Sequence, residues 1–299
     1  MRLSRTGSEP TAGLRAAVLG SPVAHSLSPV LHKAAYRELG LDGWRYEAIE
    51  CDEAGLPALL DSLGPGWAGL SLTMPLKRSV LPLLDQAEQL VTDVGAANTV
   101  LLAGGQRAGY NTDVPGMAAA LTTAEVTVAS RTEPVLLLGG GATACSAVSA
   151  LHRAGAHSVL AAVRDPATAG QLRHVARHLG LELDLVAFGA GRGRAQWLSG
   201  YRGRLFSLLL STVPARAADD FAGLLAAGEL LAGAVFDVVY HPWPTRLAVA
   251  AAAAGLPVIS GFELLLHQAA GQVSLMTGHP APVAAMRAAG LAALSGRVG

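Results

Sequence analysis

The most constraining feature of the sequence is an unbroken apolar run that ends in glycines. Residues 135–138 are all apolar, as is typical of a strand that a parallel sheet buries on both faces. Five small residues follow this run: Gly139, Gly140, Gly141, Ala142 and Thr143. A backbone without Cβ atoms can approach a pyrophosphate closely, and the next helix adds unpaired N–H groups. These five residues are therefore expected to bind a dinucleotide. The alternative is a plain strand-to-helix turn, because Ala144 replaces the last glycine of the usual G-x-G-x-x-G pattern.

Short apolar runs alternate with helical patterns along most of the chain. In the first half, strands are expected at 16–20, 45–49 and 69–73, with helices over 28–39 and 54–63. In the second half, strands are expected at 135–138, 159–163, 183–187, 205–211 and 234–239, with helices over 144–154 and 171–179. From Gly261 onward the pattern is again helical. This order predicts an α/β fold with parallel sheets, and its second half has the pattern of a doubly wound nucleotide-binding domain.

Composition excludes several classes of function. The 299 residues fit two domains of ordinary size, and 22 basic residues balance 22 acidic ones, so no basic surplus favours a nucleic-acid partner. Cys51 and Cys145 are too few for a disulfide framework and have no metal-ligand spacing, so we expect a reduced, cytoplasmic protein without a metal. The polar start, residues 1–13, has no signal-peptide core, and the alanine-rich stretch 247–256 is too short to span a membrane.

The end of the strand after the glycine turn indicates which dinucleotide binds. An NAD site usually has an acidic residue there, whereas an NADP site uses arginine for the 2′-phosphate. The strand ends in Val163, Arg164 and Asp165, so Arg164 favours NADP. An inward-pointing Asp165 would repel the phosphate. We therefore interpret Asp165 as a cap or turn residue before Pro166.

Four polar groupings lie in the otherwise apolar first half: 25–29, 71–77, 95–99 and 109–113. Ser26 and Ser28 are two residues apart, so their hydroxyls can face one anion in an extended turn, although N-capping of a helix by Ser28 is the alternative. Lys77 and Asp113 follow predicted strands or turns, and ligands bind outside the carboxyl ends of parallel strands. These groupings are therefore expected to form a ligand site.

In this order the four groupings resemble the shikimate dehydrogenase family, whose motifs there are G-x-P-x-x-H-S-x-S-P, N-V-T-x-P-x-K, G-A-x-N-T and G-x-N-T-D-x-x-G. The resemblance covers the chain from about Leu14 to Arg287. It implies two domains. The first, residues 1–113 and 261–299, would be an α/β substrate-binding domain with a parallel-rich sheet. The second, residues 114–260, would be a Rossmann-like, doubly wound NADP-binding domain.

The resemblance also implies roles for matching positions. Ser26 and Ser28 would bind the substrate carboxylate, and Lys77 and Asp113 would be the catalytic pair. Further substrate contacts would come from Ser71, Thr73, Asn98, Tyr240 and Gln268, with Asn98 contacting ring hydroxyls and Ser71 standing where the family commonly has asparagine. Beyond the glycine turn and Arg164, expected NADP contacts are Thr212, Val213, Val238 and Gly261.

The expected reaction is the NADPH-dependent reduction of 3-dehydroshikimate to shikimate, in which Lys77 protonates the developing oxyanion and Asp113 holds the ammonium. Ser71, Val163 and Asp165 keep open a quinate/shikimate or aminoshikimate dehydrogenase using NAD or NADP. A non-catalytic NADP-binding protein and a folate-pathway dehydrogenase are more distant alternatives. The expected partner is the small-molecule substrate, without nucleic acid or membrane, in a monomer or homodimer.

Overall fold

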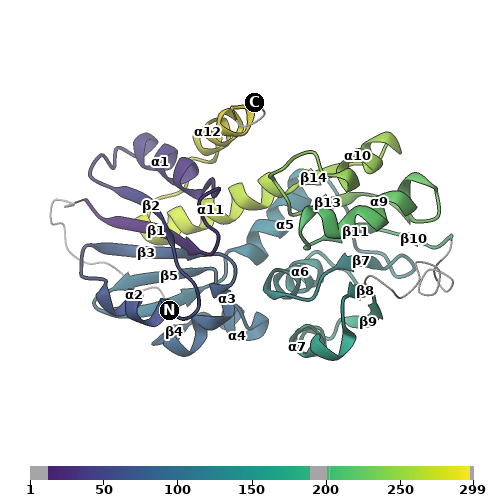
Figure 1. Ribbon diagram of the computed structural model, residues 1–299, viewed down its shortest axis with the longest axis horizontal. Helices are drawn as coiled ribbons and strands as arrows, with labels where there is room; N and C mark the ends of the chain where they lie inside the picture. The colour runs from purple at the N-terminus through teal and green to yellow at the C-terminus, as the bar shows by residue number, and fades with distance from the viewer. Residues whose placement is uncertain (1–12, 189–200, 202, 297–299) are drawn as a thin grey trace.

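The computed structural model describes residues 13–188, 201 and 203–296, so most of the polar N-terminal segment lies outside it. Two six-stranded sheets stand side by side and form two halves of the molecule (Figure 1). The predicted two-domain α/β architecture is confirmed. Among the described residues, no helix is long and apolar enough to cross a bilayer.

The first sheet has the order β2-β1-β3-β5-β6-β4. Its strands are β1 (Arg15–Gly20), β2 (Arg45–Glu50), β3 (Trp67–Leu72), β4 (Gln86–Ala87), β5 (Thr99–Ala103) and β6 (Gln106–Tyr110). The helices of this half are α1 (Ser28–Glu38), α2 (Leu56–Ser62), α3 (Leu76–Ser79) and α4 (Gln89–Val94), with the 3₁₀ turn η1 (Leu81–Leu83). The predicted strands β1, β2 and β3 are confirmed and parallel, as their crossover helices require.

The hairpin of β5 and β6 was not predicted. The two strands are antiparallel, and their turn uses Gly104 and Gly105 at φ +61° and +79°. Two positive φ angles match the tight turns that favour the right-handed twist of hairpins, and glycine adopts them without strain. Two adjacent glycines between two short strand-like segments were the sequence signal for this turn.

The second sheet is entirely parallel, in the order β14-β13-β11-β7-β8-β9. Its strands are β7 (Val135–Leu138), β8 (Ser158–Val163), β9 (Glu182–Ala187), β11 (Leu208–Ser211), β13 (Val235–Asp237) and β14 (Val258–Ser260). The expected strand 205–211 is divided, because β10 (Leu205–Phe206) leaves this sheet to pair with β12 (Leu231–Ala232). β14 was missed, since three residues after a proline give little periodicity.

Helices cover both faces of the second sheet. They are α6 (Ala142–Arg153), α7 (Gly170–Leu179), α9 (Asp219–Ala226) and α10 (Arg246–Ala253), with the 3₁₀ turns η2 (Pro166–Thr168) and η3 (Ala215–Ala218). Alternate residues of β7 enter opposite cores. Val135 and Leu137 pack in the core with α6 and α7, whereas Leu136 and Leu138 pack in the core with α9 and α10. This alternation explains why the strand carries no polar residue.

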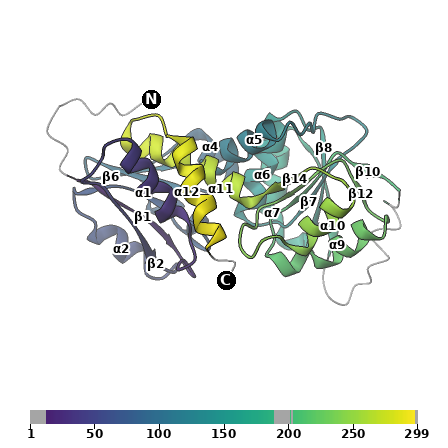
Figure 2. The ribbon, with the colours of Figure 1, turned by 90° about the horizontal axis from the view of Figure 1, so that it is seen from above.

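Two helices connect the halves. α5 (Asp113–Thr123) leads from the first sheet toward the second, and α11 (Gly261–Thr277) returns from β14 to the first. They lie together between the sheets in both views (Figures 1 and 2). Their crossing is close, because a Cβ atom at Gly116 would lie 3.0 Å from the backbone nitrogen of Gln268. The last helix, α12 (Val283–Ser295), packs on α1.

Candidate active site

The polar groupings of the first half meet at one edge of its sheet. β1 and β3 are parallel, so Gly20 and Leu72 end at the same edge. β5 is antiparallel to β3 and therefore begins there, with Thr99 opposite both Ser71 and Tyr110. β6 reverses direction once more and ends at the same edge with Tyr110. The chain thus delivers all four groupings to one place, partly through the unpredicted hairpin.

Lys77 and Asp113 form an ion pair at this edge. Lys77 lies in the short helix α3 after β3, and Asp113 is the first residue of α5 after β6. The Lys77 Nζ atom lies 2.6 Å from Asp113 Oδ2, with side chains 16% and 5% exposed. A pair this sheltered keeps one geometry, since little water competes for either charge. The lysine remains the more accessible partner and can present its ammonium to a ligand.

Asn98 fixes the carboxylate from the other side. Its Nδ2 atom donates to Asp113 Oδ1 at 2.9 Å and to Thr112 Oγ1 at 2.9 Å, and contacts Gln268 Oε1 at 3.3 Å. Its Oδ1 atom accepts from the backbone N–H of Thr112 at 2.8 Å. Asn98 and Gln268, two of the predicted substrate contacts, therefore lie beside the ion pair. Thr112 joins them, although sequence reasoning gave it no role.

The two serines lie at the start of α1. The Ser26 Oγ atom accepts from the backbone N–H of Ser28 at 3.2 Å, so the two residues close one small turn. The alternative that Ser28 is an N-cap is wrong, because Leu27 holds that position and, among the described residues, no side chain caps the helix. Both serines thus have contacts within the protein: Ser26 closes this turn, and Ser28 is a hydrogen-bonding neighbour of the Tyr46 hydroxyl.

Thr73 and Tyr240 lie at facing ends of the two halves. Thr73 covers the end of β1, since a Cβ atom at Gly20 would lie 2.3 Å from Thr73 Cγ2. Tyr240 follows β13 and packs partly buried against the core around α1 and α11. His25 and His241 have ring centroids 6.4 Å apart, so the loops after β1 and β13 meet. Residues of both halves thus border a common site.

Ser71 makes two buried contacts that the sequence did not predict. Its hydroxyl accepts from the Tyr46 hydroxyl at 2.6 Å and donates to Gln272 Oε1 at 2.8 Å. The side chain is buried at the end of β3, where these two contacts use its single proton. Neither Tyr46 nor Gln272 was predicted. Gln272 lies four residues after Gln268 on α11, a spacing that places both side chains on one helix face.

Direct contacts also join the halves beside the catalytic pair. Arg78 of α3 donates to the Sγ atom of Cys145 in α6 at 3.4 Å, and Asn111 donates to Ser146 Oγ at 3.2 Å. Burial raises the pKa of the Cys145 thiol, and the nearby Arg78 acts in the opposite direction. The cysteine therefore stays protonated and packs as a small apolar residue.

The glycine turn of the second half fits a pyrophosphate. Gly139 has φ +112°, and a Cβ atom there would lie 2.5 Å from Thr212 Oγ1 and 3.2 Å from Val213 Cγ1. The Thr212 hydroxyl donates to the Leu138 carbonyl at 2.7 Å and ties β11 to β7, the point where strand order reverses. Ligands bind at such a switch point.

Gly141, at the start of α6, leaves space for that ligand. Within the described part of the chain, no atom outside its neighbours lies within 4 Å of a Cβ atom built there, and no side chain caps α6. Free N–H groups, the positive end of the helix and open space suit a phosphate. The residues present thus fit the group that the sequence predicted.

Arg164 and Asp165 differ in what their side chains contact. The Asp165 Oδ1 atom accepts from the backbone N–H of Ala167 at 2.9 Å and caps η2, which confirms the cap interpretation. Arg164 is exposed beyond β8 and has no hydrogen bond or ion pair to another described residue. Its guanidinium can therefore receive a phosphate, while the neighbouring carboxylate is occupied locally.

Gly261 has a packing role. It begins α11, and a Cβ atom there would lie 2.0 Å from the Val238 carbonyl oxygen. Its N–H donates to the Val239 carbonyl at 3.2 Å. Close packing of α11 on the end of β13 therefore requires this glycine, which sets the path of the helix that carries Gln268.

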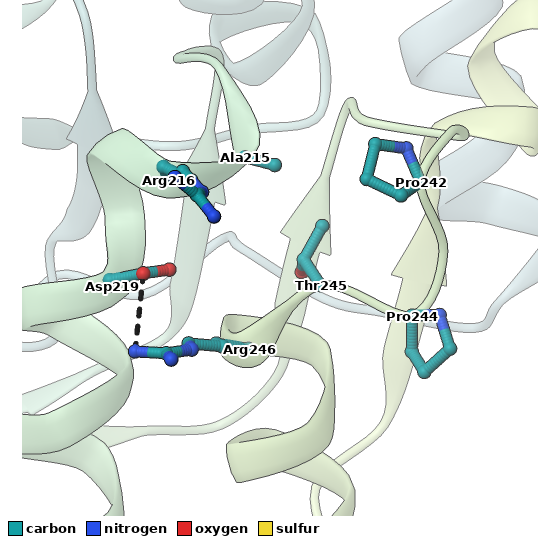
Figure 3. A pocket seen from close by; sticks show the side chains of 7 residues that line it. All are labelled: Ala215, Arg216, Asp219, Pro242, Pro244, Thr245 and Arg246. Carbon is teal, nitrogen blue, oxygen red and sulfur yellow. Dashed lines mark ion pairs between the residues drawn. The ribbon is translucent and has the colours of Figure 1, made fainter.

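A separate cavity of about 470 Å³ opens where β11 and β13 end, on the side of α9 and α10 (Figure 3). It is lined by Ala215, Arg216, Asp219, Pro242, Pro244, Thr245 and Arg246. Arg246 pairs with Asp219 at 3.4 Å. None of the predicted site residues lines this cavity, so it lies beside the site rather than in it.

Fold and site together define a two-domain α/β protein with a Rossmann-type second domain and a buried ammonium–carboxylate pair in the first. The profile "Shikimate dehydrogenase substrate binding domain" matches residues 18–100, and "Shikimate 5′-dehydrogenase C-terminal domain" matches residues 261–289. The chain belongs to the shikimate dehydrogenase family.

Individual relatives cover nearly the whole chain. A shikimate dehydrogenase (NADP(+)) of Chlorobaculum tepidum is 35% identical over 93% of this chain and 95% of its own. The crystal structure of Mycobacterium tuberculosis shikimate dehydrogenase is 41% identical, with a TM-score of 0.81 over 93% of this chain and 99% of its own. The Thermus thermophilus enzyme in complex with NADP(H) and shikimate is 32% identical, with a TM-score of 0.76 over 94% of this chain and 100% of its own. These matches confirm the resemblance stated from the motifs.

Proposed function

We propose that this chain catalyses the reversible, NADPH-dependent reduction of 3-dehydroshikimate to shikimate, in the biosynthesis of chorismate and the aromatic amino acids. The observation that carries this proposal is the sheltered 2.6 Å pair of Lys77 and Asp113 at the edge where four strands bring their polar residues. It is supported by the Thermus thermophilus relative, whose structure contains NADP(H) and shikimate.

Each protein group has one task in this reaction. When bound, NADPH supplies the hydride. Lys77 donates a proton from Nζ to the carbonyl oxygen as negative charge develops there, and it accepts the hydroxyl proton in the reverse direction. Asp113 holds the ammonium at 2.6 Å, so the lysine does not need to be oriented during the reaction.

The remaining residues would position the two ligands. Ser26 and Ser28 would bind the substrate carboxylate, while Thr73, Asn98, Tyr240 and Gln268 would hold the ring. The turn 139–143, with Thr212, Val213 and Val238, would hold the dinucleotide, and Arg164 would bind its 2′-phosphate. The division into a substrate domain (1–113 and 261–299) and a cofactor domain (114–260) follows from the same assignment, since α5 and α11 begin at these boundaries.

A location in the reducing cytoplasm agrees with two free thiols, Cys51 and Cys145. For the assembly we keep the expectation of a monomer or homodimer, which light scattering on the purified protein would decide.

Initial rates on the purified protein, in a matrix of two substrates and two cofactors, test the function. We expect turnover to be fastest with shikimate and NADP+, and slower when quinate or NAD+ replaces either. A preference for quinate or for NAD+ would instead support a quinate/shikimate dehydrogenase. Tight NADPH binding without any turnover would support a non-catalytic binding protein.

A further inference from the structure

A chain of buried hydrogen bonds begins on β2, away from the ion pair. The Tyr46 hydroxyl donates to Ser71 Oγ at 2.6 Å, and Ser71 Oγ donates to Gln272 Oε1 at 2.8 Å. All three side chains are less than a tenth exposed. Polar groups buried to this degree are costly unless each has a partner, and these contacts provide a partner for each of the three side chains.

The chain continues to Asn98. Gln272 Nε2 donates to Thr99 Oγ1 at 3.1 Å and to the Asn98 carbonyl at 3.1 Å. Thr99 Oγ1 then donates to Asn98 Oδ1 at 3.0 Å. Asn98 in turn donates to Asp113, so the sequence of bonds ends at the carboxylate that holds the lysine.

The structure gives each bond a direction. The Tyr46 hydroxyl donates to Ser71, and Ser71 donates in turn to Gln272, while Ser28 is a second hydrogen-bonding neighbour of the phenol. Burial raises the pKa of Tyr46 well above its ordinary value, which keeps this donor protonated. Gln272 then presents oxygen to Ser71 and nitrogen to Thr99.

The last hydrogen bond of this chain determines the orientation of the Asn98 side-chain amide. Thr99 Oγ1 already accepts a proton from Gln272, so it donates its own to Asn98 Oδ1. With Oδ1 committed to Thr99 and to the Thr112 N–H, the Nδ2 atom is left facing Asp113. A flipped amide would place an oxygen against the carboxylate and lose a hydrogen bond at each end.

We propose that Tyr46, Ser71, Thr99 and Gln272 are positioning residues that fix the orientation of the Asn98 amide and thereby aim Asp113 and Lys77. This inference rests on the proposed function and deepens it. It reassigns Ser71 from a substrate contact to a member of this chain.

Thr99→Val is the central test, because valine keeps the shape and removes the relaying hydroxyl. Thr99→Ser is the matched control, since it keeps the hydroxyl and removes only a methyl group. We expect Thr99→Val to lower kcat for shikimate oxidation about tenfold, the effect of losing one buried hydrogen bond that aims a reacting group. The Thr99→Ser variant should retain kcat within about threefold of the wild-type value.

Two further measurements distinguish a loss of positioning in Thr99→Val from a simple packing defect. The solvent deuterium isotope effect on kcat should increase in Thr99→Val, because a misaligned lysine slows proton transfer. The dissociation constant for NADPH should stay unchanged, since the glycine turn lies in the other half of the molecule.

Tyr46→Phe and Tyr36→Phe test the far end of the chain. Both phenols are buried and lie close together, but the Tyr36 hydroxyl contacts only the Nδ1 atom of His32, at 3.5 Å, among the side chains for which a bond is described. We expect Tyr46→Phe to lower kcat about threefold and Tyr36→Phe to leave it unchanged.

Two kinetic results would overturn the proposal. One is a folded Thr99→Val variant whose kcat stays within twofold of wild type, and the other is an equal loss in Thr99→Ser. The side-chain amide signals of Asn98 in NMR give a measurement independent of turnover. They should be slow to exchange with solvent in the wild type and faster in Thr99→Val, and equal exchange would also refute the proposal. A wild-type protein without shikimate turnover would refute the proposed function alone.

Discussion

The two sheet edges that border the site are built in opposite ways. At the edge of the first sheet, side chains hold one another: Lys77 binds Asp113, which binds Asn98. At the edge of the second sheet, the important residues are glycines, which have no side chain: Gly139 allows a close approach to Thr212, and Gly141 leaves open space. Removing atoms should therefore damage the first edge, whereas adding atoms should damage the second.

The largest effect is expected from removing the ammonium. Lys77→Ala should lower kcat about 10³-fold, because the oxyanion loses both its proton donor and its counter-charge. Shikimate affinity, measured by calorimetry, should change far less, since the serine pair is intact. A near-normal kcat would exclude lysine from proton transfer. It would also contradict the expectation that the first edge depends on the side chains present there.

The next effect comes from adding one methyl group to the cofactor edge. Gly139→Ala should destabilise the fold by about 1–3 kcal/mol, because alanine is strained at φ +112° and would press on Thr212. Gly141→Ala is the matched variant. Its backbone has φ −81° and its Cβ atom meets open space within the described residues, so the melting temperature should hold while the Kd for NADPH rises about tenfold or more. A Gly141→Ala variant that binds NADPH normally would place the pyrophosphate elsewhere.

A smaller and more selective effect is expected at the end of β8. Arg164→Ala should raise KM for NADPH about tenfold, as one charge-assisted contact is lost, and leave KM for NADH almost unchanged. Steady-state kinetics with both cofactors measure this. Equal changes for the two would mean that other residues bind the 2′-phosphate.

The smallest effect concerns the neighbouring carboxylate. Asp165→Ala should cost about 0.5–1 kcal/mol of stability, because the Ala167 N–H loses its cap. The preference for NADPH over NADH should not change by more than about twofold, since the carboxylate is engaged in the turn. A marked shift in preference would show that Asp165 acts on the cofactor.

Sequence predicted the second half of the molecule better than the connections of the first. β7 and the glycines after it can be predicted from the local sequence. A strand buried on both faces requires apolar residues throughout, and a positive φ angle favours glycine. Lys77 meets Asp113 only because the β5–β6 hairpin returns the chain to the same sheet edge. The motifs identified these two residues, but they did not reveal the hairpin that brings them together. The partners of Ser71 could not be predicted, because Tyr46 and Gln272 come from distant elements, β2 and α11, and only the packed structure brings them together.

The same hairpin suggests where the chain can be opened. Its tip, Gly104 and Gly105, is exposed, and a Cβ atom at either glycine would meet nothing within 4 Å among the described residues. The tip lies one strand length from the catalytic edge, because β5 begins at that edge and runs away from it. New chain ends, a fluorescent label or a surface tether could be introduced there, and the engineered protein would keep its chemistry while reporting on its neighbours.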